Sequence, residues 1–356
     1  FKNFIIELES MLTIIEKTLI DYVKSKNECS SREIFDGTNI PVSYATLKRS
    51  LSKLVANNLL STIGKGKGTK YIISPIFEVI QPVNLEVYYL KEIDERKIKE
   101  GFNFSILTEI LPKTTVFTPT ELKKLDSLQA TFKENSSHLS ISEYSKEFER
   151  LAIDLSWKSS QIEGNTYSLL ETERLLKEKE TALGKTKKEA AMLLNHKEAL
   201  DFILENPDYL NPLQVSKIED IHSILMKELD VERNLRKRRV GISGTNYKPL
   251  DNEFQIIEAL ELTCQLINGK QNVFEKALLT LVLISYIQPF IDGNKRTARI
   301  VSNAILINHN YCPISFRTVD AVEYKKAMLL FYEQNNISSF KEIFINQFEF
   351  AVNTYF

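Results

Sequence analysis

The stretch that decides the fold is residues 288–299, which read QPFIDGNKRTAR. The apolar run before it predicts a buried helix that ends at Pro289, because proline does not continue a helix. The turn at residues 292–294 then leads into a second helix. A turn that opens a helix presents free backbone N–H groups and the positive end of the helix dipole. Residues 292–299 are therefore a predicted binding site for an anion.

Charged side chains in this stretch make the prediction more specific. Arg296 and Arg299 lie three residues apart, so they share one helical face, and Gly293 lets the backbone approach a ligand closely. Guanidinium groups pair well with phosphate oxygens, which indicates a di- or triphosphate. Asp292 is a candidate Mg²⁺ ligand, since that ion prefers one or two carboxylates together with phosphates. A plain turn followed by two surface arginines is the alternative that the pattern leaves open.

The composition excludes several classes of protein. The 356 residues carry 46 basic and 47 acidic side chains, for a net charge of −1, and no apolar run approaches the ~20 residues of a membrane-spanning helix. No leader for export is recognisable, and the three distant cysteines predict free thiols in a reducing cytoplasm. None of the four histidines has metal-ligand spacing, so no zinc site is expected. The sequence predicts a mainly helical, cytoplasmic protein without a membrane partner.

The first 78 residues predict a small domain of three helices and a hairpin. Apolar residues at helical spacing define the first helix: Ile5, Leu8, Leu12, Ile15, Leu19 and Val23. Ser30 and Glu33 form a capping box that opens the second helix, and Ser43 caps the third. Two β-prone runs around a Gly/Lys tip predict a hairpin over residues 62–73.

This order of elements resembles a winged helix-turn-helix domain. Basic residues on the third helix and at the hairpin tip would then contact DNA phosphates; they are Lys48, Arg49, Lys53, Lys65, Lys67 and Lys70. A protein-docking module with solvated lysines is the alternative. Residues 79–125 are expected to form a helical connecting region, with a charged helix over 85–100 and a new helix starting at Thr118-Pro119.

Residues 288–299 also resemble the Fic motif, H-P-F-x-[DE]-G-N-[GK]-R-x-x-R, at every fixed position except the first. The resemblance extends from about Leu151 to the C-terminus, within a domain placed at 126–356. Residues 159–165 resemble the family's inhibitory motif, [ST]-x-x-x-E-[GN], on a helix near 155–165. Residues 239–250, a Gly-rich polar segment that predicts a loop or small hairpin, stand where the family has its flap. The implied architecture is mainly α: an all-helical Fic fold with a small β-hairpin flap, preceded by an N-terminal α+β winged-helix domain.

The resemblance implies ligands and residue roles. Fic proteins mostly transfer AMP from ATP to a Ser, Thr or Tyr hydroxyl, so the implied cofactors are ATP and Mg²⁺ and the implied partner is a protein target or the chain itself. The implied catalytic positions are Gln288, Asn294 and Arg296, and Asp292 is the implied metal ligand. Nucleotide binding is implied for Gly293, Asn294, Lys295, Arg296 and Arg299, with Arg299 on the γ-phosphate. The inhibitory residues are Ser159, Glu163 and Gly164, and the target-docking residues of the flap are Ile242, Ser243, Gly244 and Tyr247.

Gln288 departs from the family pattern, because the motif begins with the histidine that serves as general base. A neutral amide orients a hydroxyl but does not accept its proton near neutral pH. A general base contributes typically ~10²–10⁴-fold in rate, so we expect weak or altered catalysis with nucleotide binding retained. Two alternatives stay open: a catalytically silent, nucleotide-sensing DNA-binding regulator of bacterial type, and a transferase in which Gln288 positions another acceptor or supports hydrolysis. The sequence also leaves a homodimer open.

Overall fold

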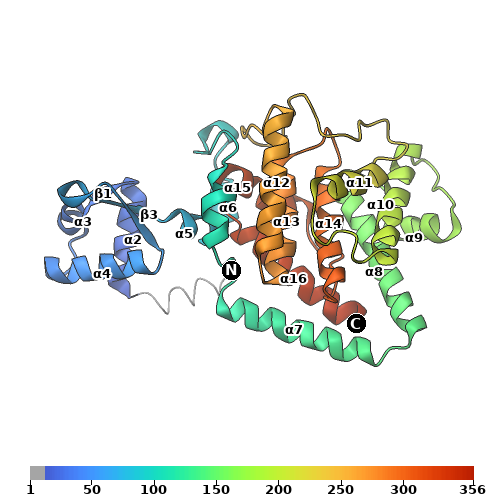
Figure 1. Ribbon diagram of the computed structural model, residues 1–356, viewed down its shortest axis with the longest axis horizontal. Helices are drawn as coiled ribbons and strands as arrows, with labels where there is room; N and C mark the ends of the chain where they lie inside the picture. The colour runs from blue at the N-terminus through green and yellow to red at the C-terminus, as the bar shows by residue number, and fades with distance from the viewer. Residues whose placement is uncertain (1–12) are drawn as a thin grey trace. The chain divides into compact units, whose positions relative to one another are not determined.

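The computed structural model describes residues 13–356, which divide into two compact units (Figure 1). The first unit ends at Leu90 and includes residues 334–339; the second holds residues 91–333 and 340–356. Three residues of the expected first helix, Ile5, Leu8 and Leu12, lie outside the described range.

The first unit contains the predicted helices and hairpin. Its helices are α2 (Ile14–Lys26), α3 (Ser31–Thr38), α4 (Tyr44–Ala56), α5 (Pro75–Ile80) and α6 (Leu85–Tyr88). Its strands are β1 (Cys29–Ser30), β2 (Leu60–Ile63) and β3 (Lys70–Ile73), which form an antiparallel sheet in the order β1-β3-β2. Ser30 accepts a hydrogen bond from the Glu33 N–H and Ser43 from the Thr46 N–H, so both predicted caps are confirmed. The winged-helix assignment itself stays a prediction.

The first unit ends at Leu90, beyond the predicted boundary at residue 78. Phe77 on α5 joins the buried core that α2, α3 and α4 share. The N–H of Ile337 donates to the Val79 carbonyl at 2.7 Å, and the Asn336 side chain donates to the carbonyls of Glu78 and Gln81. Residues after 78 therefore complete this unit, and the predicted connecting region at 79–125 is divided between the two units.

The expected charged helix over 85–100 is wrong. Helix α6 ends at Tyr88, and only a 3-10 turn at Ile93–Glu95 follows. The backbone here bonds to distant segments, because the Lys99 N–H donates to the Glu333 carbonyl and the Glu100 carbonyl accepts from the Lys248 N–H. Long-range partners thus replace the local hydrogen bonds of a helix.

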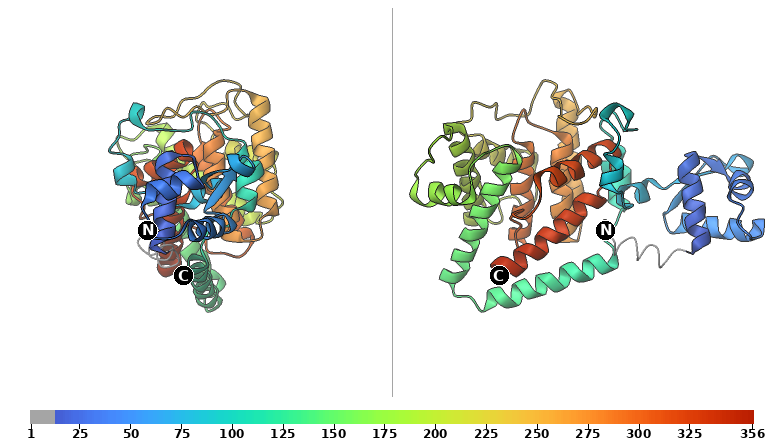
Figure 2. Two further views of the ribbon diagram at one scale, coloured as in Figure 1. Left: turned by 90° about the vertical axis from the view of Figure 1, so that its left-hand side faces the viewer. Right: turned by 180° about the vertical axis from the view of Figure 1, so that it is seen from behind.

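The second unit is helical and is built around α13 and α14. Its helices are α7 (Pro119–Ser137), α8 (Ile141–Ile162), α9 (Leu169–Glu178), α10 (Lys187–Glu205), α11 (Val215–Leu225), α12 (Glu253–Gly269), α13 (Val273–Ile287), α14 (Asn294–Asn308), α15 (Ala321–Gln334) and α16 (Ser338–Tyr355). Figure 2 shows this unit from two further sides, with α13 and α14 in orange and α15 and α16 in red. Ring contacts of Tyr286 with Phe331, and of Phe274 with Phe348, pack α15 and α16 against α13. Within residues 13–356, no helix combines the length and apolar character of a membrane span.

Of the loop and the small β-hairpin expected for residues 239–250, the structure has the loop, and the hairpin does not form. This segment is an extended loop whose one bridge is a parallel pairing of Lys248 with Gly101. Its polar groups bond to other segments instead of across a hairpin: Arg96 donates to the Gly244 carbonyl at 2.7 Å, and Asn246 donates to the Asp94 carboxylate at 2.9 Å. Contacts with residues 94–101 therefore fix the loop, as pairing with a second strand would do in a hairpin.

Candidate functional site

The turn between α13 and α14 is shaped by two residues in the left-handed conformation. Gln288 ends α13 with φ 52°, and Gly293 precedes α14 with φ 81°. The positive φ favours glycine here, and a Cβ on Gly293 would lie 2.5 Å from Cε of Met226, so a larger residue would also have to displace the end of that flexible side chain. Because glycine has no side chain to cap the helix, the first-turn N–H groups of α14 lack a side-chain cap.

Two residues that the sequence analysis did not assign to the site hold this turn in place. The ring nitrogens Nε2 and Nδ1 of His222 lie 2.9 and 3.0 Å from the carbonyl oxygens of Asp292 and Arg233, and its ring stacks on Phe290. Arg236 is fully buried and donates to the Gln288 carbonyl at 2.6 Å. Their bonded partners Asp292 and Gln288 lie 70 and 52 residues further along the chain, so no local pattern in the sequence indicates these contacts.

Asn294 and Gln288 bond to each other inside the turn. Asn294 Nδ2 donates to Gln288 Oε1 at 3.1 Å and to the carbonyl of Phe290. The backbone N–H of Phe290 in turn donates to Asn294 Oδ1. Gln288 Nε2 donates to the Ser285 carbonyl at 2.6 Å and to the Tyr332 hydroxyl at 3.3 Å. Both ends of the Gln288 amide are therefore already engaged within the protein.

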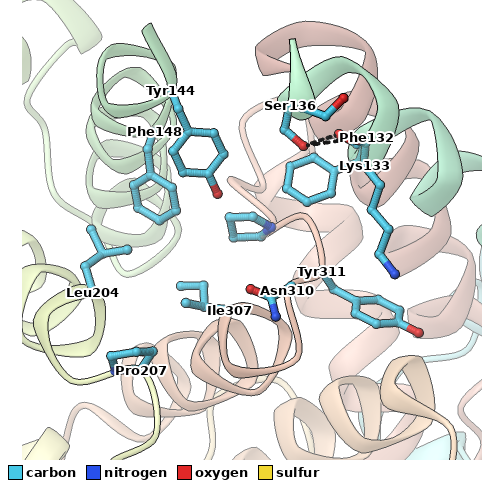
Figure 3. Close-up of a pocket in the computed structure, with 12 residues that line it drawn as sticks. Phe132, Lys133, Ser136, Tyr144, Phe148, Leu204, Pro207, Ile307, Asn310 and Tyr311 are labelled. Carbon is cyan, nitrogen blue, oxygen red and sulfur yellow. Dashed lines mark hydrogen bonds between the residues drawn. The ribbon is translucent and has the colours of Figure 1, made fainter. Parts of the chain in front are cut away.

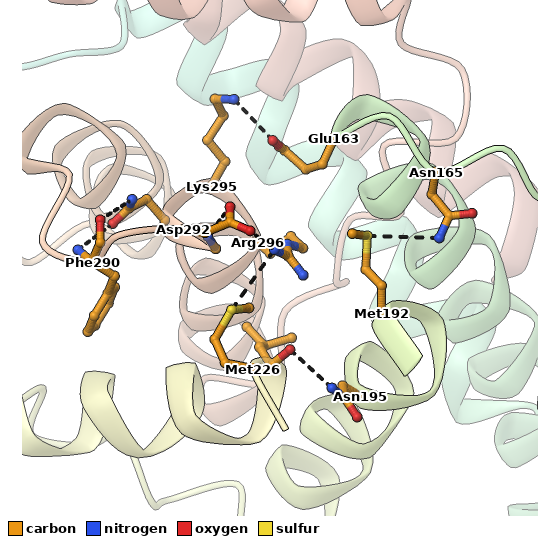
Figure 4. A network of polar contacts seen from close by, with 12 residues as sticks. Glu163, Asn165, Met192, Asn195, Met226, Phe290, Asp292, Lys295 and Arg296 are labelled. Carbon is orange, nitrogen blue, oxygen red and sulfur yellow. Dashed lines mark hydrogen bonds and ion pairs between the residues drawn. The ribbon is translucent and has the colours of Figure 1, made fainter. Parts of the chain in front are cut away.

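Arg296 is almost completely buried, with 1% of its side chain exposed. One nitrogen, Nη2, donates to the Asp292 carboxylate at 3.0 Å, a pair visible in Figure 4. Nε and Nη1 have no hydrogen-bond partner among the described residues. Burial lowers the pKa of the guanidinium while Asp292 opposes the shift, and arginine stays charged at neutral pH.

Arg299 is fully buried and contacts the predicted inhibitory residues. Its Nε donates to Ser159 Oγ at 2.8 Å, and its Nη2 donates to the Ser159 carbonyl and to Glu163 Oε1, both at 3.0 Å. The guanidinium lies 5.3 Å from the centre of the Tyr324 ring. The pairing of Glu163 with Arg299 that the resemblance implied is therefore present in the structure.

Glu163 bridges two cations, because its second oxygen accepts from Lys295 Nζ at 3.1 Å (Figure 4). It caps the C-terminal end of α8, and Gly164 with φ 95° turns the chain away immediately after it. Burial leaves 19% of the Glu163 side chain exposed and raises its pKa, but Arg299 and Lys295 outweigh burial and hold the pKa below its usual value. The carboxylate is therefore ionised at neutral pH.

Several buried polar atoms around the two arginines lack partners among the described residues. They are Nε and Nη1 of Arg296, Nη1 of Arg299 and both ring nitrogens of His196. Burial, together with the charges of Arg299 and Arg296, holds the pKa of His196 well below its usual value and keeps the ring neutral. Buried donors without acceptors are unfavourable, so this cluster fits an anion that supplies oxygen acceptors.

The acidic side chains of the site suit Mg²⁺ only when phosphate supplies further ligands to the ion. Among residues 13–356, no group of three or more His, Cys, Asp and Glu side chains is placed to hold a metal ion by itself. Asp292 stands at the edge of the turn with 59% of its side chain exposed, while its oxygens accept from the Gly293 N–H and from Arg296. One carboxylate next to a phosphate site suits Mg²⁺, which takes most of its other ligands from phosphate and water.

The predicted docking residues of the loop at 239–250 differ in their surroundings. Tyr247 is buried, its hydroxyl donates to the Tyr286 carbonyl at 3.1 Å, and its ring stacks on that of Tyr286. Tyr247 therefore anchors the loop and offers no surface to a target. Ser243 is exposed and Ile242 and Gly244 are half-buried, so target docking stays a prediction for these three residues.

The basic residues predicted to bind DNA are partly paired within the first unit. Lys53 pairs with the Glu16 carboxylate at 2.7 Å and Lys70 with that of Glu28 at 2.5 Å. Lys48 Nζ donates to Ser31 Oγ at 3.4 Å. Arg49 and Lys65 are exposed, and the side chain of Lys67 is not among those that the structure describes. The DNA-binding assignment stays a prediction.

A separate cavity of about 470 Å³ lies at the other end of α14 (Figure 3). Phe148 and Ile307 are among its apolar lining residues, and Lys133 lies at its edge. The serine hydroxyls beside it already donate to backbone carbonyls of α7. None of the predicted site residues lines this cavity, so it is distinct from the candidate phosphate site.

Part of the chain is similar to proteins of a known family. Residues 212–306 match the family model of the Fic/DOC family. The chain is 29% identical over 174 residues to protein adenylyltransferase Fic of Nematostella vectensis, a match that covers 47% of this chain and 40% of the relative. It is 25% identical over 170 residues to protein adenylyltransferase fic-1 of Caenorhabditis elegans, covering 46% and 33%. The chain thus matches less than half the length of either relative.

Solved structures share the fold over about two thirds of this chain. Fic-1 from Caenorhabditis elegans superposes with a TM-score of 0.57 and 20% identity, over 66% of this chain and 72% of that one. A Fic-domain-containing signaling protein from Bacteroides thetaiotaomicron gives a TM-score of 0.57 and 20% identity, over 65% and 94%. At these identities the likeness establishes the fold, and the mainly helical architecture is confirmed.

Proposed function

Because residues 212–306 form a Fic/DOC-family domain, we propose that the chain binds ATP·Mg²⁺ as protein adenylyltransferases do, with Glu163 as an inhibitor and with catalysis weakened by Gln288. The observation that carries the proposal is the cluster of buried, unpartnered N–H groups on Arg296 and Arg299. Both arginines belong to α14, whose N-terminal turn has no side-chain cap. Phosphate oxygens are the acceptors that both features suit.

Each residue of the turn has a role in this proposal. Arg296 offers the N–H groups of two nitrogens, Nε and Nη1, to the phosphates, and the first-turn amides from Asn294 onward add further donors. Asp292 would hold Mg²⁺, which supplies positive charge to the phosphate oxygens when bound. His222 and Arg236 keep the backbone of the turn in position through the Asp292 and Gln288 carbonyls. The γ-phosphate would pair with Arg299.

Glu163 competes with that last interaction. Its carboxylate occupies Nη2 of Arg299 and, through Lys295, a second cation beside the turn. A triphosphate that uses Arg299 must displace Glu163, because two anions do not share one guanidinium edge at close range. ATP bound with Glu163 in place would have its phosphates shifted from the geometry that transfer requires. This supports an inhibitory role for Glu163.

Transfer to a hydroxyl needs a proton acceptor that the turn lacks. In the reaction, the hydroxyl oxygen bonds to the α-phosphorus, pyrophosphate leaves, and the hydroxyl proton must be taken up. Gln288 is a neutral amide whose oxygen already accepts from Asn294. The nearby Tyr332 hydroxyl is no substitute at neutral pH, because burial raises its pKa well above its usual value. We therefore expect that Gln288 slows transfer and leaves nucleotide binding unchanged.

The second candidate function is a nucleotide-sensing DNA-binding regulator without catalysis. Two observations favour it: the engaged amide at Gln288 and the exposed basic residues Arg49 and Lys65 of the first unit. Against it stands the Glu163–Arg299 pair, because an inhibitory contact has no use where nothing remains to be inhibited.

One experiment tests the proposed function directly. The full chain is incubated with α-³²P-labelled ATP and Mg²⁺, with and without Glu163→Gly, and label on protein is followed by denaturing electrophoresis. We expect faint labelling of the native chain and stronger labelling of the variant. Calorimetry on the same samples measures ATP binding independently of transfer. Bound ATP with no label in either sample would favour the regulator, and absence of ATP binding in both would contradict the phosphate site.

A further inference from the structure

The segment that follows Glu163 is fastened to the start of another helix. We call residues 164–168, between α8 and α9, the strap. Thr166 lies in the strap, and its N–H and its hydroxyl donate to one oxygen of Glu189 at 3.0 and 2.6 Å. The other oxygen of Glu189 accepts from the N–H and hydroxyl of Thr186, the N-cap residue of α10, both at 2.9 Å. Glu189 therefore joins the strap to the first turn of α10.

Further contacts act at the same place. Asn165 Nδ2 donates to the Glu189 carbonyl at 2.9 Å, and Lys185 Nζ donates to the Thr166 carbonyl at 2.5 Å. Trp157 on α8 donates to the Tyr167 carbonyl at 3.0 Å. The hydrogen bonds from Thr166 and Thr186 lower the pKa of Glu189 to about 2, so this carboxylate stays ionised at physiological pH.

The position of the strap ties these contacts to Glu163. Only Gly164 and Asn165 separate Glu163 from Thr166, and Gly164 contributes no side-chain contact of its own. Glu163 ends α8, and the last turn of a helix frays when nothing holds the residues beyond it. The bonds to Glu189 are therefore placed to keep Glu163 against Arg299.

We propose that Glu189, by binding Thr166, forms a latch that sets how strongly Glu163 blocks Arg299. The proposal rests on the inhibitory role of Glu163 in the proposed function and adds the means by which that role is controlled. The Glu163–Arg299 pair is largely buried, whereas Thr166 is exposed and Glu189 is half-exposed. The latch is thus the part of the inhibitory arrangement that lies at the surface.

Two substitutions of Thr166 and one control test the latch in the full chain. Thr166→Val removes the hydroxyl donor at nearly constant size, and Thr166→Asp places a like charge against Glu189. Glu143→Gln is the matched control, because Glu143 also completes a capping box on α8, but at the opposite end from Glu163. Each variant is made alone and together with Glu163→Gly. The measurements are ATP·Mg²⁺ affinity by calorimetry and hydrogen exchange of residues 160–168 without nucleotide.

We expect Thr166→Val to speed exchange in residues 160–168 and to raise ATP affinity about fivefold, within the usual range of coupling between two sites. Thr166→Asp should have the larger effect, the Glu143→Gln control should have none, and neither Thr166 variant should add to Glu163→Gly. Unchanged exchange and affinity in both Thr166 variants would overturn the latch, as would an equal gain in the Glu163→Gly background. If Glu163→Gly alone leaves ATP affinity unchanged while Thr166→Asp still speeds exchange, the inhibitory role in the proposed function is what fails.

Discussion

Two basic regions of this molecule differ in how their charges are satisfied. In the helical unit, Arg296 and Arg299 are buried, with donors that no described residue accepts. In the first unit, basic side chains such as Lys53 lie at the surface, where water and nearby carboxylates satisfy them. A buried donor without an acceptor is unfavourable and points to a missing ligand, whereas an exposed lysine needs none. The difference supports the proposal of a specific anion site at the arginines and indicates at most a diffuse attraction at the lysines.

The largest expected effect comes from completing the motif around the buried arginines. Gln288→His should introduce a base with a pKa near ~6.5 and raise transfer by roughly 10²–10⁴-fold. The gain should be greatest together with Glu163→Gly, because a base is of no use while Arg299 is occupied. Label incorporation at saturating ATP compares the native chain with the single and double variants. Equal rates in the native chain and the His variant would mean that another group takes the proton.

Removing one buried arginine should weaken nucleotide binding strongly. Loss of a hydrogen bond to a charged group costs about 1.5–3 kcal/mol, so Arg296→Ala should reduce ATP affinity by roughly ten- to over a hundredfold. Arg317→Ala is the control. The Arg317 guanidinium pairs with the Asp154 carboxylate at a distance of 3.1 Å and not with a residue of the turn at 288–293. Calorimetry measures both variants. If the two variants bound ATP with equal affinity, the buried Arg296 would contribute no more to binding than the partly exposed Arg317.

A smaller effect should appear in the acid stability of the helical unit. The folded protein holds the pKa of Glu163 below its usual value of 4.5, so the carboxylate stabilises the fold above that pH and loses this contribution as pH falls below it. Urea unfolding from pH 7 to pH 3 should show a shallower acid-side decline for Glu163→Gln than for the native chain. Parallel pH profiles would indicate that Glu163 keeps its ordinary pKa in the folded state.

The smallest effect concerns the exposed lysines and arginine of the first unit. If this unit binds duplex DNA, Arg49→Glu and Lys65→Glu should weaken binding moderately and should flatten the fall of affinity with salt. Gel shifts of the full chain with a genomic DNA pool at several salt concentrations give this slope. No shift of native protein even at low salt would leave protein docking as the role of this unit.

Local features of the sequence were predictable because their partners lie within a few residues. The caps at Ser30 and Ser43, the start of α7 at Thr118 and the turn at Gly293 each depend on neighbours in the chain. The pairing of Glu163 with Arg299 was expected only through the resemblance to a family. No spacing rule connects two residues that are so distant in sequence.

Features with distant partners were not predictable. The loop at 239–250 has the glycines of a hairpin, but Arg96 and residues near it take its hydrogen bonds. The charged run after Leu90 has the look of a solvated helix, yet Arg96 is buried against Glu333 at 3.3 Å. Tyr247 was expected to meet a target and instead anchors the loop in the interior. In each case tertiary contacts outweighed local propensity.

The distance along the chain between Glu163 and Arg299, 136 residues, has a consequence for folding. Helices α8, α11 and α14 must all have docked before the turn at residues 288–293, His222 and Glu163 come together. Contacts between such remote segments form late, because a long loop must close first. A truncated chain that keeps residues 288–299 but lacks α8 would contain the motif without Glu163, and in a growing chain Glu163 has no Arg299 to pair with until α14 has been synthesised.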